Sequence, residues 1–259
     1  MSDHRARKRF GQHFLTATDT IEQIVAAVAP QQDETIVEIG PGQAAITAPL
    51  ADLATTLHAI EFDRDLVTTL RQRFAGRENV VIHQADALSF DFASLGNNLR
   101  IVGNLPYNIS TPLLFHLLGY KNVIADMHFM LQKEVVERMA AAPGSKRYGR
   151  LTIMLGCHLE VIHLFDVPPS AFSPPPKVMS SVVRMRPIPQ PAFDINDAEL
   201  FEKLVKQAFS RRRKTLRNAL DGLASAADIQ SAGLDCSQRP EQIPIAGWVN
   251  LANLLADSQ

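Results

Sequence analysis

Cysteine is scarce in this sequence, which has only Cys157 and Cys236 among its 259 residues. Two cysteines this far apart supply neither a disulfide framework nor a thiolate metal site. The eight histidines show no metal-ligand spacing either. His158 and His163 lie in an apolar stretch, where we expect half-buried strand residues and not ligands. The sequence therefore predicts no metal and a reducing compartment.

Long apolar runs are also missing. No uninterrupted run is long enough to cross a bilayer. The N-terminus is basic, with Arg5, Arg7, Lys8 and Arg9, but no apolar signal-peptide core follows it. A hydrophobic content of 46% and a charged content of 20% are typical of a soluble globular protein. We therefore expect a cytoplasmic protein without membrane association, long enough for one large domain and a small one.

Charge of either sign is nearly balanced, with a net charge of −1, but its distribution is uneven. Residues 1–13 carry four Lys or Arg against one Asp, and residues 201–220 carry seven against one Glu. The second group contains the run Arg211–Lys214, which we place at the start of a helix. A solvated face is the alternative, but so dense a cluster repels itself without a counter-anion. Two basic islands on an acidic body indicate a polyanionic partner.

Alternating patterns predict an α/β fold with a largely parallel sheet. Helical patterns separate the apolar or β-branched runs, which we predict as strands at 35–39, 56–61, 80–82, 99–103 and 127–131, with two long strands at 153–165 and 178–185. The proline-rich stretch 187–191 reads as a stiff linker. Beyond it only helical patterns follow. The sequence thus predicts a catalytic domain over 1–187, with an N-terminal arm over 1–16, and a small all-α domain over 188–259.

Asn104-Leu105-Pro106-Tyr107 follows an apolar run, so we expect it at the carboxyl end of a buried strand, where ligands bind in open α/β sheets. The Asn104 side-chain oxygen and the Leu105 carbonyl can both accept hydrogen bonds from one exocyclic amine, which concentrates the lone pair of its nitrogen. Pro106 fixes the backbone and has no competing N–H. Tyr107 offers a flat face to a base. Taken alone, the tetrapeptide could be an ordinary turn.

Glycines follow the first predicted strand, where Gly40 and Gly42 would let the backbone approach a ligand closely. With Ala45 they satisfy a dinucleotide-binding pattern. Two features disfavour a pyrophosphate at this turn. Pro41 lacks an N–H that a pyrophosphate cradle would use, and the carboxylate of Glu38 is an unfavourable neighbour for phosphate.

Acids follow the next two strands. Glu61 lies about twenty residues beyond the glycines, where a carboxylate can accept hydrogen bonds from both hydroxyls of a ribose. Asp86 follows the third strand and either accepts from an adenine amino group or caps a helix. Later in the chain, Phe172 precedes a stiff run of prolines. It would form a second stacking face over the site, and the alternative is an aromatic that fills the loop.

Seven motifs, in this order and spacing, resemble those of the ribosomal RNA small subunit adenine dimethyltransferases that act on 16S rRNA. The resemblance covers nearly the whole chain, and the seven together are highly specific. The motifs are Gln12-His13-Phe14-Leu15, Val37-Glu38-Ile39-Gly40-Pro41-Gly42, Ile60-Glu61, Asp86-Ala87, Asn104-Leu105-Pro106-Tyr107-Asn108-Ile109-Ser110, Phe172-Ser173-Pro174-Pro175-Pro176-Lys177-Val178 and Arg212-Arg213-Lys214-Thr215-Leu216-Arg217-Asn218.

The resemblance implies a Rossmann-like class I methyltransferase sheet with helices on both faces and a helical, basic RNA-binding domain. It implies S-adenosylmethionine as cofactor, S-adenosylhomocysteine as product, and two adjacent adenines in the 3′-terminal hairpin of 16S rRNA as substrate. We expect a monomer that acts on free RNA or on the small ribosomal subunit.

The cofactor residues carried over are His13, Leu15, Gly40, Gly42, Glu61, Asp86 and Asn104. The catalytic residues are Asn104, Leu105 and Tyr107. The substrate-binding residues are Pro106, Tyr107, Phe172, Lys177, Arg211, Arg212 and Lys214. Many relatives carry Asn at the position of His13, whose imidazole can still form a hydrogen bond.

Three other functions compete with this one. A ribosome-assembly or RNA-binding factor could keep the fold without turnover, although the intact motif at Asn104 disfavours this. A DNA adenine methyltransferase could use the same amine-binding motif, but the basic C-terminal domain and the Phe172 loop follow the rRNA family. A nicotinamide-dependent oxidoreductase ranks last, because the chain offers no acid or base for hydride transfer.

Overall fold

The computed structural model describes residues 13–188 and 193–258, which fall into two compact units. The first unit extends to Val136 and takes in Val161–Pro187. The second consists of Glu137–Glu160 and the chain from Ile188 onward. The sequence placed residues 137–160 in the catalytic domain, whereas the structure groups them with the C-terminal helices. Among the predicted linker residues, 189–191 lie outside the described part of the chain.

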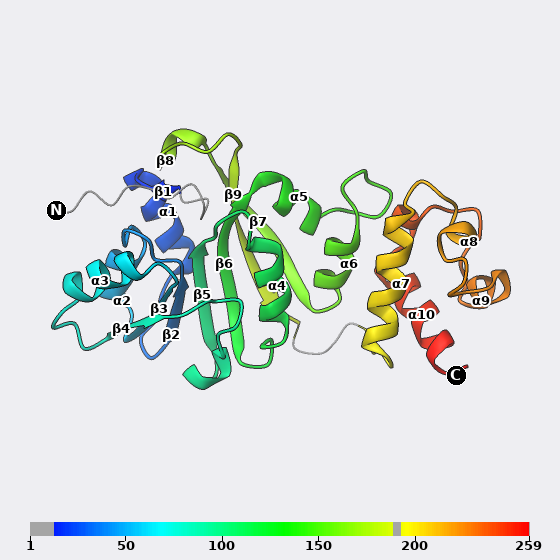
Figure 1. Cartoon of the computed structure of the whole chain (residues 1–259), viewed down its shortest axis with the longest axis horizontal. Coiled ribbons are helices and arrows are strands. Elements are labelled where there is room, and N and C mark those ends of the chain that lie inside the picture. Colours follow the sequence, from blue (N-terminus) through cyan, green and yellow to red (C-terminus); the bar gives the residue numbers. More distant parts are fainter. Residues whose placement is uncertain (1–12, 189–192, 259) are drawn as a thin grey trace. The chain divides into compact units, whose positions relative to one another are not determined.

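The first unit alternates strands and helices (Figure 1). Two elements, α5 and β7, cross the division between the units. The elements up to β9 are β1 (Phe14–Leu15), α1 (Thr18–Val28), β2 (Thr35–Ile39), α2 (Thr47–Leu53), β3 (Thr56–Glu61), α3 (Arg64–Arg73), β4 (Val80–Gln84), η2 (Phe92–Leu95), β5 (Leu99–Asn104), α4 (Ser110–Leu118), β6 (Ile124–Gln132), α5 (Lys133–Met139), α6 (Arg150–Gly156), β7 (Leu159–Val167), η3 (Pro169–Ala171), β8 (Phe172–Ser173) and β9 (Ser180–Pro187).

Seven strands form one sheet in the order β4-β3-β2-β5-β6-β9-β7. The pairs β4–β3, β3–β2, β2–β5 and β5–β6 are parallel, whereas β9 runs antiparallel to β6. The chain therefore starts at the centre with β2, runs outward to β4, and returns to β5 on the other side of β2. That reversal of strand order is a topological switch point, and its carboxyl edge is where open α/β sheets bind ligands.

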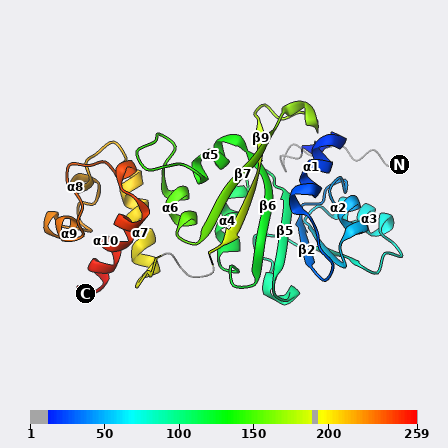
Figure 2. The same ribbon diagram turned by 180° about the vertical axis from the view of Figure 1, so that it is seen from behind.

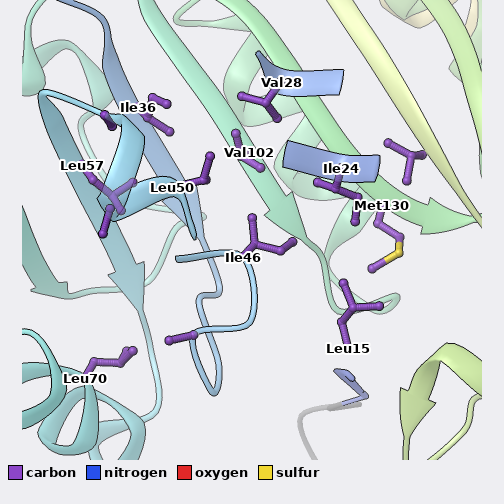
Figure 3. Packing of buried hydrophobic residues seen from close by; sticks show 14 of the residues in the cluster. Leu15, Ile24, Val28, Ile36, Ile46, Leu50, Leu57, Leu70, Val102 and Met130 are labelled. Atoms are coloured by element: carbon purple, nitrogen blue, oxygen red, sulfur yellow. The ribbon is translucent and has the colours of Figure 1, made fainter. Parts of the chain in front are cut away.

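Helices cover both faces of the sheet, as the sequence predicted. On one face the apolar side chains of α1, α2 and α3 pack against alternate residues of β2, β3, β5 and β6. Figure 3 shows this cluster, in which Ile24 and Val28 of α1 lie near Val102 of β5 and Met130 of β6. Helix α4 covers the opposite face of the sheet. It passes in front of the strands in Figure 1 and behind them in Figure 2.

The second unit has its own helical core. Its helices beyond the linker are α7 (Ala198–Ser210), α8 (Leu216–Ala219), α9 (Ala226–Ser231), η4 (Pro240–Gln242) and α10 (Ile245–Ala256). Trp248 of α10 is completely buried and belongs to one apolar cluster with Phe201 of α7 and Ile153 of α6. This packing explains why 137–160 group with the C-terminal helices, because α6 buries its apolar residues there.

The predicted strand over 153–165 is partly wrong. Residues up to Gly156 belong to α6, and the strand β7 begins only at Leu159. Helix α6 is short and buried on several sides, so its apolar residues show neither the period of a helix nor that of a strand. As a consequence His158 lies in the turn between the two elements and not in a strand, and His163 in β7 is exposed.

Candidate active site

A cavity of about 220 Å³ lies where β2, β3 and β5 end. The structure gathers most of the predicted site residues around it. Those that line it are His13, Gly40, Gly42, Glu61, Asp86, Asn104, Leu105, Pro106 and Tyr107. Phe172, Lys177 and Leu15 are not among the lining residues, although Leu15 lines a smaller neighbouring cavity.

The loop after β2 needs its glycines. Gly40 and Gly42 have φ angles of +70° and +56°, a region that strains any residue with a side chain. A Cβ on Gly42 would also lie 3.2 Å from the ring of Phe14. Because both positions lack side chains, the backbone itself forms this wall of the cavity.

Glu61 ends β3 as a buried carboxylate fixed by two backbone groups. The N–H of Gly42 donates to its Oε2 over 3.2 Å, and the N–H of Asp63 donates to its Oε1 over 2.8 Å. Burial raises the pKa of Glu61, and these two backbone hydrogen bonds lower it. The backbone of Phe62 also lowers this pKa, and the carboxylate lines the cavity, where it can accept hydrogen bonds from hydroxyl groups. The next residue, Phe62, is 61% exposed and adds an apolar face.

Asp86 does not cap a helix, because residues 87–89 form a turn, and its predicted contact with an adenine amino group stays a prediction. Its Oδ1 accepts a hydrogen bond from the N–H of Leu88 over 2.9 Å, so it fixes the turn after β4. It also lines the cavity, together with Leu88. The second oxygen of a carboxylate in this position is available to accept from an amino group of a ligand.

Asn104, the last residue of β5, has a fixed amide orientation. Its Nδ2 donates to the main-chain carbonyl of His13 over 3.1 Å, which leaves Oδ1 as the acceptor end of the amide. The strand must pass very close to β2 here, since a Cβ on Gly103 would lie 2.7 Å from the carbonyl oxygen of Ile39. Gly103 is a positioning residue that the sequence analysis missed.

Tyr107 is held at both ends. Its hydroxyl lies 2.8 Å from Oγ of Ser180, the fully buried first residue of β9. Its ring stacks on the imidazole of His13, with 5.9 Å between centroids and an interplanar angle of 30°. Burial raises the pKa of Tyr107, so the phenol is neutral near pH 7. No motif marked Ser180, which is 73 residues away in the chain.

The ring of His13, which stacks on Tyr107, also contacts the proline-rich loop. Its Nδ1 lies 2.7 Å from the carbonyl oxygen of Pro174, and because a carbonyl can only accept, Nδ1 carries the proton. The main-chain carbonyl of the same residue holds Asn104. His13 therefore positions Asn104 through its backbone carbonyl and contacts Pro174 through its ring.

Phe172 does not stand over the cavity. It pairs with Leu15 in the two-stranded sheet of β1 and β8, and both side chains are buried in the apolar core. Only 4% of Phe172 is exposed. The interpretation as an exposed stacking face is wrong for this conformation, and the loop-filling alternative describes it. Lys177, later in the same loop, is exposed.

The basic run lies in the turn between α7 and α8 and not at a helix start, because α7 ends at Ser210. Cations at a helix C-terminus interact favourably with its partial negative charge. Arg211 donates to the carbonyl of Asn218, and both it and Lys214 are exposed. Arg212 is different, because it is half-buried, donates to the carbonyl of Ser145 over 3.3 Å and pairs with Glu241 at 3.5 Å. The basic residues of the N-terminal arm before His13 lie outside the described residues.

No helix within 13–188 or 193–258 is long and apolar enough to cross a membrane. Over the same residues, no group of three or more His, Cys, Asp or Glu side chains could hold a metal ion.

The chain is similar to known proteins along its whole length. A family model described as ribosomal RNA adenine dimethylase matches residues 3–257. Ribosomal RNA small subunit methyltransferase A of Chromobacterium violaceum is 54% identical, covering 99% of this chain and 98% of its own. The protein of the same name from Pseudomonas putida is 53% identical, covering 99% of this chain and 97% of its own.

Solved structures agree with this fold. The crystal structure of a dimethyladenosine transferase from Plasmodium falciparum has a TM-score of 0.79 and 25% identity, covering 92% of this chain and 96% of its own. The 23S rRNA methyltransferase ErmE, with a TM-score of 0.73 and 24% identity, shares the fold. The methyl transfer that defines such enzymes implies S-adenosylmethionine as donor. The matched length and these identities show that the chain belongs to the ribosomal RNA adenine dimethylases, methyltransferases that act on adenine in ribosomal RNA.

Proposed function

We propose that this chain transfers methyl groups to the N6 amines of two adjacent adenines in the 3′-terminal hairpin of 16S rRNA, giving N6,N6-dimethyladenosine and S-adenosylhomocysteine. The observation that carries the proposal is the amide of Asn104, whose Nδ2 is held by the His13 carbonyl beside Tyr107 in the cavity. The cytoplasmic location and the monomeric state expected from the sequence stay predictions.

The cavity fits S-adenosylmethionine by the chemistry of its walls. The buried carboxylate of Glu61 lines the cavity and would accept from the ribose hydroxyls, and Asp86 has an oxygen for the adenine amino group. The backbone at Gly40 and Gly42 leaves room for the amino-acid end. When bound, the sulfonium supplies an electrophilic methyl group.

Asn104, which ends β5, and the residues directly after it would hold the target amine. Oδ1 of Asn104 and the carbonyl of Leu105 accept its two hydrogens, while Tyr107 stacks on the base after it has left its helix. These contacts orient the nitrogen lone pair and favour the pyramidal geometry of the transition state. No strong base is required, because the amine becomes acidic only as the methyl bond forms and its proton can then pass to water. Pro106 keeps this turn rigid, and the proposal uses no second stacking face from Phe172.

The direct test is transfer of labelled methyl groups. The purified protein is incubated with labelled S-adenosylmethionine and small ribosomal subunits that lack the modification, and the RNA is digested to nucleosides. Labelled dimethyladenosine supports the proposal. Tight binding of subunits without label in the RNA would instead support an assembly factor, and label appearing only in duplex DNA would support a DNA methyltransferase.

Ser180 should act on catalysis through Tyr107. Removing their hydrogen bond by Tyr107→Phe or by Ser180→Ala is expected to lower kcat about 3–10-fold, because the ring loses the contact that fixes its orientation. The double variant should be no slower than the slower single variant. Donor affinity, measured by calorimetry, should not change. Multiplied losses in the double variant would show that the two residues act independently.

The exposed cations after α7 should bind RNA phosphates. Replacing Arg211, Arg213 and Lys214 by Gln is expected to lower the slope of log K against log salt by about 2–3, at about 0.7–0.9 per phosphate contact. Filter binding over a series of salt concentrations measures the slope. The control replaces Arg64 and Arg71, which are exposed on α3 and lie outside the basic group of residues 201–220, and it should leave the slope unchanged. Arg212→Gln should mainly lower stability, since that side chain is tied to Glu241 and Ser145. An unchanged slope in the triple variant would remove the run from the interface.

A further inference from the structure

Four polar side chains gather where β9 begins, and we call them the Asp166 cluster. Lys133 begins α5, His163 and Asp166 lie on β7, and Ser181 lies on β9. All four belong to the first unit. In the sheet, β9 lies between β6 and β7 (Figure 2). The cluster is therefore at the edge where β6 ends, beside the end of β5 and Asn104.

The carboxylate of Asp166 connects the other three side chains. The Ser181 hydroxyl donates to its Oδ1 over 2.6 Å, and Nε2 of His163 lies 2.9 Å from the same oxygen. Lys133 donates to Oδ2 and forms an ion pair with it. The hydrogen bonds from Lys133, Ser181 and His163 hold the pKa of Asp166 well below its usual range. The carboxylate is therefore charged near pH 7, and because it can only accept, Nε2 of His163 carries the proton.

Ser181 is the only buried member of the cluster. The side chains of Lys133 and Asp166 keep 39% and 32% of their surface exposed, and His163 is exposed as well. An ion pair so open to water contributes little by itself. A hydrogen bond from a hydroxyl to a charged carboxylate is stronger than one between neutral groups. The contact of Asp166 that matters most for the fold is therefore the one that fixes Ser181 on β9.

Ser180, the residue before Ser181, carries this restraint to the active site. Its hydroxyl lies 2.8 Å from that of Tyr107, and its pairing with Gln132 is the last one between β9 and β6. The chain reaches Ser180 from residues 177–179, which are exposed and lie outside any helix or strand. The end of a strand opens easily after such a segment unless further contacts hold it. The hydrogen bond of Ser181 to Asp166 supplies one such contact, since it ties this end of β9 to β7.

We propose that Asp166 is a positioning residue for the stacking of Tyr107 on the target base. It fixes Ser181, and the neighbouring Ser180 then keeps its hydroxyl against that of Tyr107. This inference rests on the proposed function, because it assumes that the adenine stacks on Tyr107. Tyr107 lines the active-site cavity, whereas neither Asp166 nor Ser181 is among the described residues that line it. Loss of the cluster should therefore slow methyl transfer without weakening the donor.

The test begins with single substitutions in the full-length protein. Asp166→Ala and Ser181→Ala should each lower kcat with small ribosomal subunits about 3–10-fold, the range expected for one lost hydrogen bond. The affinity for S-adenosylhomocysteine, measured by calorimetry, should not change. Asp166→Asn keeps an acceptor oxygen for the Ser181 hydroxyl, so it should restore most of the rate. The matched control is Asp52→Ala, because Asp52 is also an exposed carboxylate in an ion pair, 2.6 Å from Arg77.

A second background separates positioning from general support of the fold. Tyr107→Phe lacks the hydroxyl that contacts Ser180, so nothing of the cluster can reach its ring by that path. Asp166→Ala should cause no further loss of kcat when it is combined with Tyr107→Phe. A residue that only supports the fold would instead lower the rate by the same factor in both backgrounds.

The results decide as follows. A loss of rate confined to the protein that keeps the Tyr107 hydroxyl, with recovery in Asp166→Asn, supports the inference. Equal losses in both backgrounds would overturn it. An unchanged rate for Asp166→Ala, or a weaker affinity for S-adenosylhomocysteine, would overturn it as well. If the wild-type protein transfers no methyl group, the proposed function fails and the inference fails with it.

Discussion

Asn104→Ala should abolish most methyl transfer while leaving most of the donor affinity. Turnover is expected to fall about 100–1,000-fold, the usual effect of losing one preorganised polar group that stabilises a transition state. The substitution removes Oδ1, the acceptor for the target amine, and Nδ2, the donor to the His13 carbonyl. The second loss should loosen the N-terminal segment, so donor affinity should also fall, but by less than about tenfold.

Single-turnover rates with small ribosomal subunits and calorimetry with S-adenosylhomocysteine measure the two effects separately. Asn97→Ala is the matched control, because Asn97 is exposed in the loop that precedes the same strand. This control should leave both quantities unchanged. If Asn104→Ala lowers turnover and donor affinity by the same factor, the residue acts on the donor and its assigned role on the amine is wrong.

The cavity residues that directly end or follow a strand could be predicted from the sequence. Gly40, Glu61, Asp86 and Asn104 each end or follow an apolar run, and parallel strands necessarily bring such ends to one edge of a sheet. The alternation of apolar runs with helical patterns predicts where the strands lie. Only a few strand orders are compatible with such an alternation. This part of the site therefore depends only on local signals, which the sequence contains.

The parts that failed depend on contacts between distant residues. Phe172 is buried because β8 pairs with β1, which is more than 150 residues earlier, and no local pattern encodes that pairing. Ser180 reaches Tyr107 only because β9 inserts between β6 and β7. The hydrogen bonds of His13 to Asn104 and Pro174 follow from the same folding-back of the N-terminal segment. Sequence patterns thus predicted many of the residues that line the cavity, but not the contacts that hold these residues in place.

Glu61→Gln should have the opposite signature to Asn104→Ala. Donor affinity is expected to fall about 100-fold or more, because hydrogen bonds to a charged acceptor contribute about 1.5–3 kcal/mol each and the ribose would use two. The amide keeps one acceptor oxygen and places an NH2 group where the other was. That group cannot accept from the backbone N–H of Gly42 or Asp63, so one buried donor also loses its partner. At saturating donor, turnover should stay within about tenfold of wild type.

Calorimetry with S-adenosylhomocysteine and kcat at saturating donor measure the two quantities, and thermal unfolding reports the cost of the unpaired N–H. Glu22→Gln on the exposed face of α1 is the control for the substitution itself. A variant that binds the donor normally would place the ribose elsewhere in the cavity. A variant that binds 2′-deoxy and 3′-deoxy analogues as well as it binds the parent nucleoside, when wild type strongly prefers the parent, would assign the ribose to this carboxylate directly. The two variants together separate the group that holds the donor from the group that holds the amine.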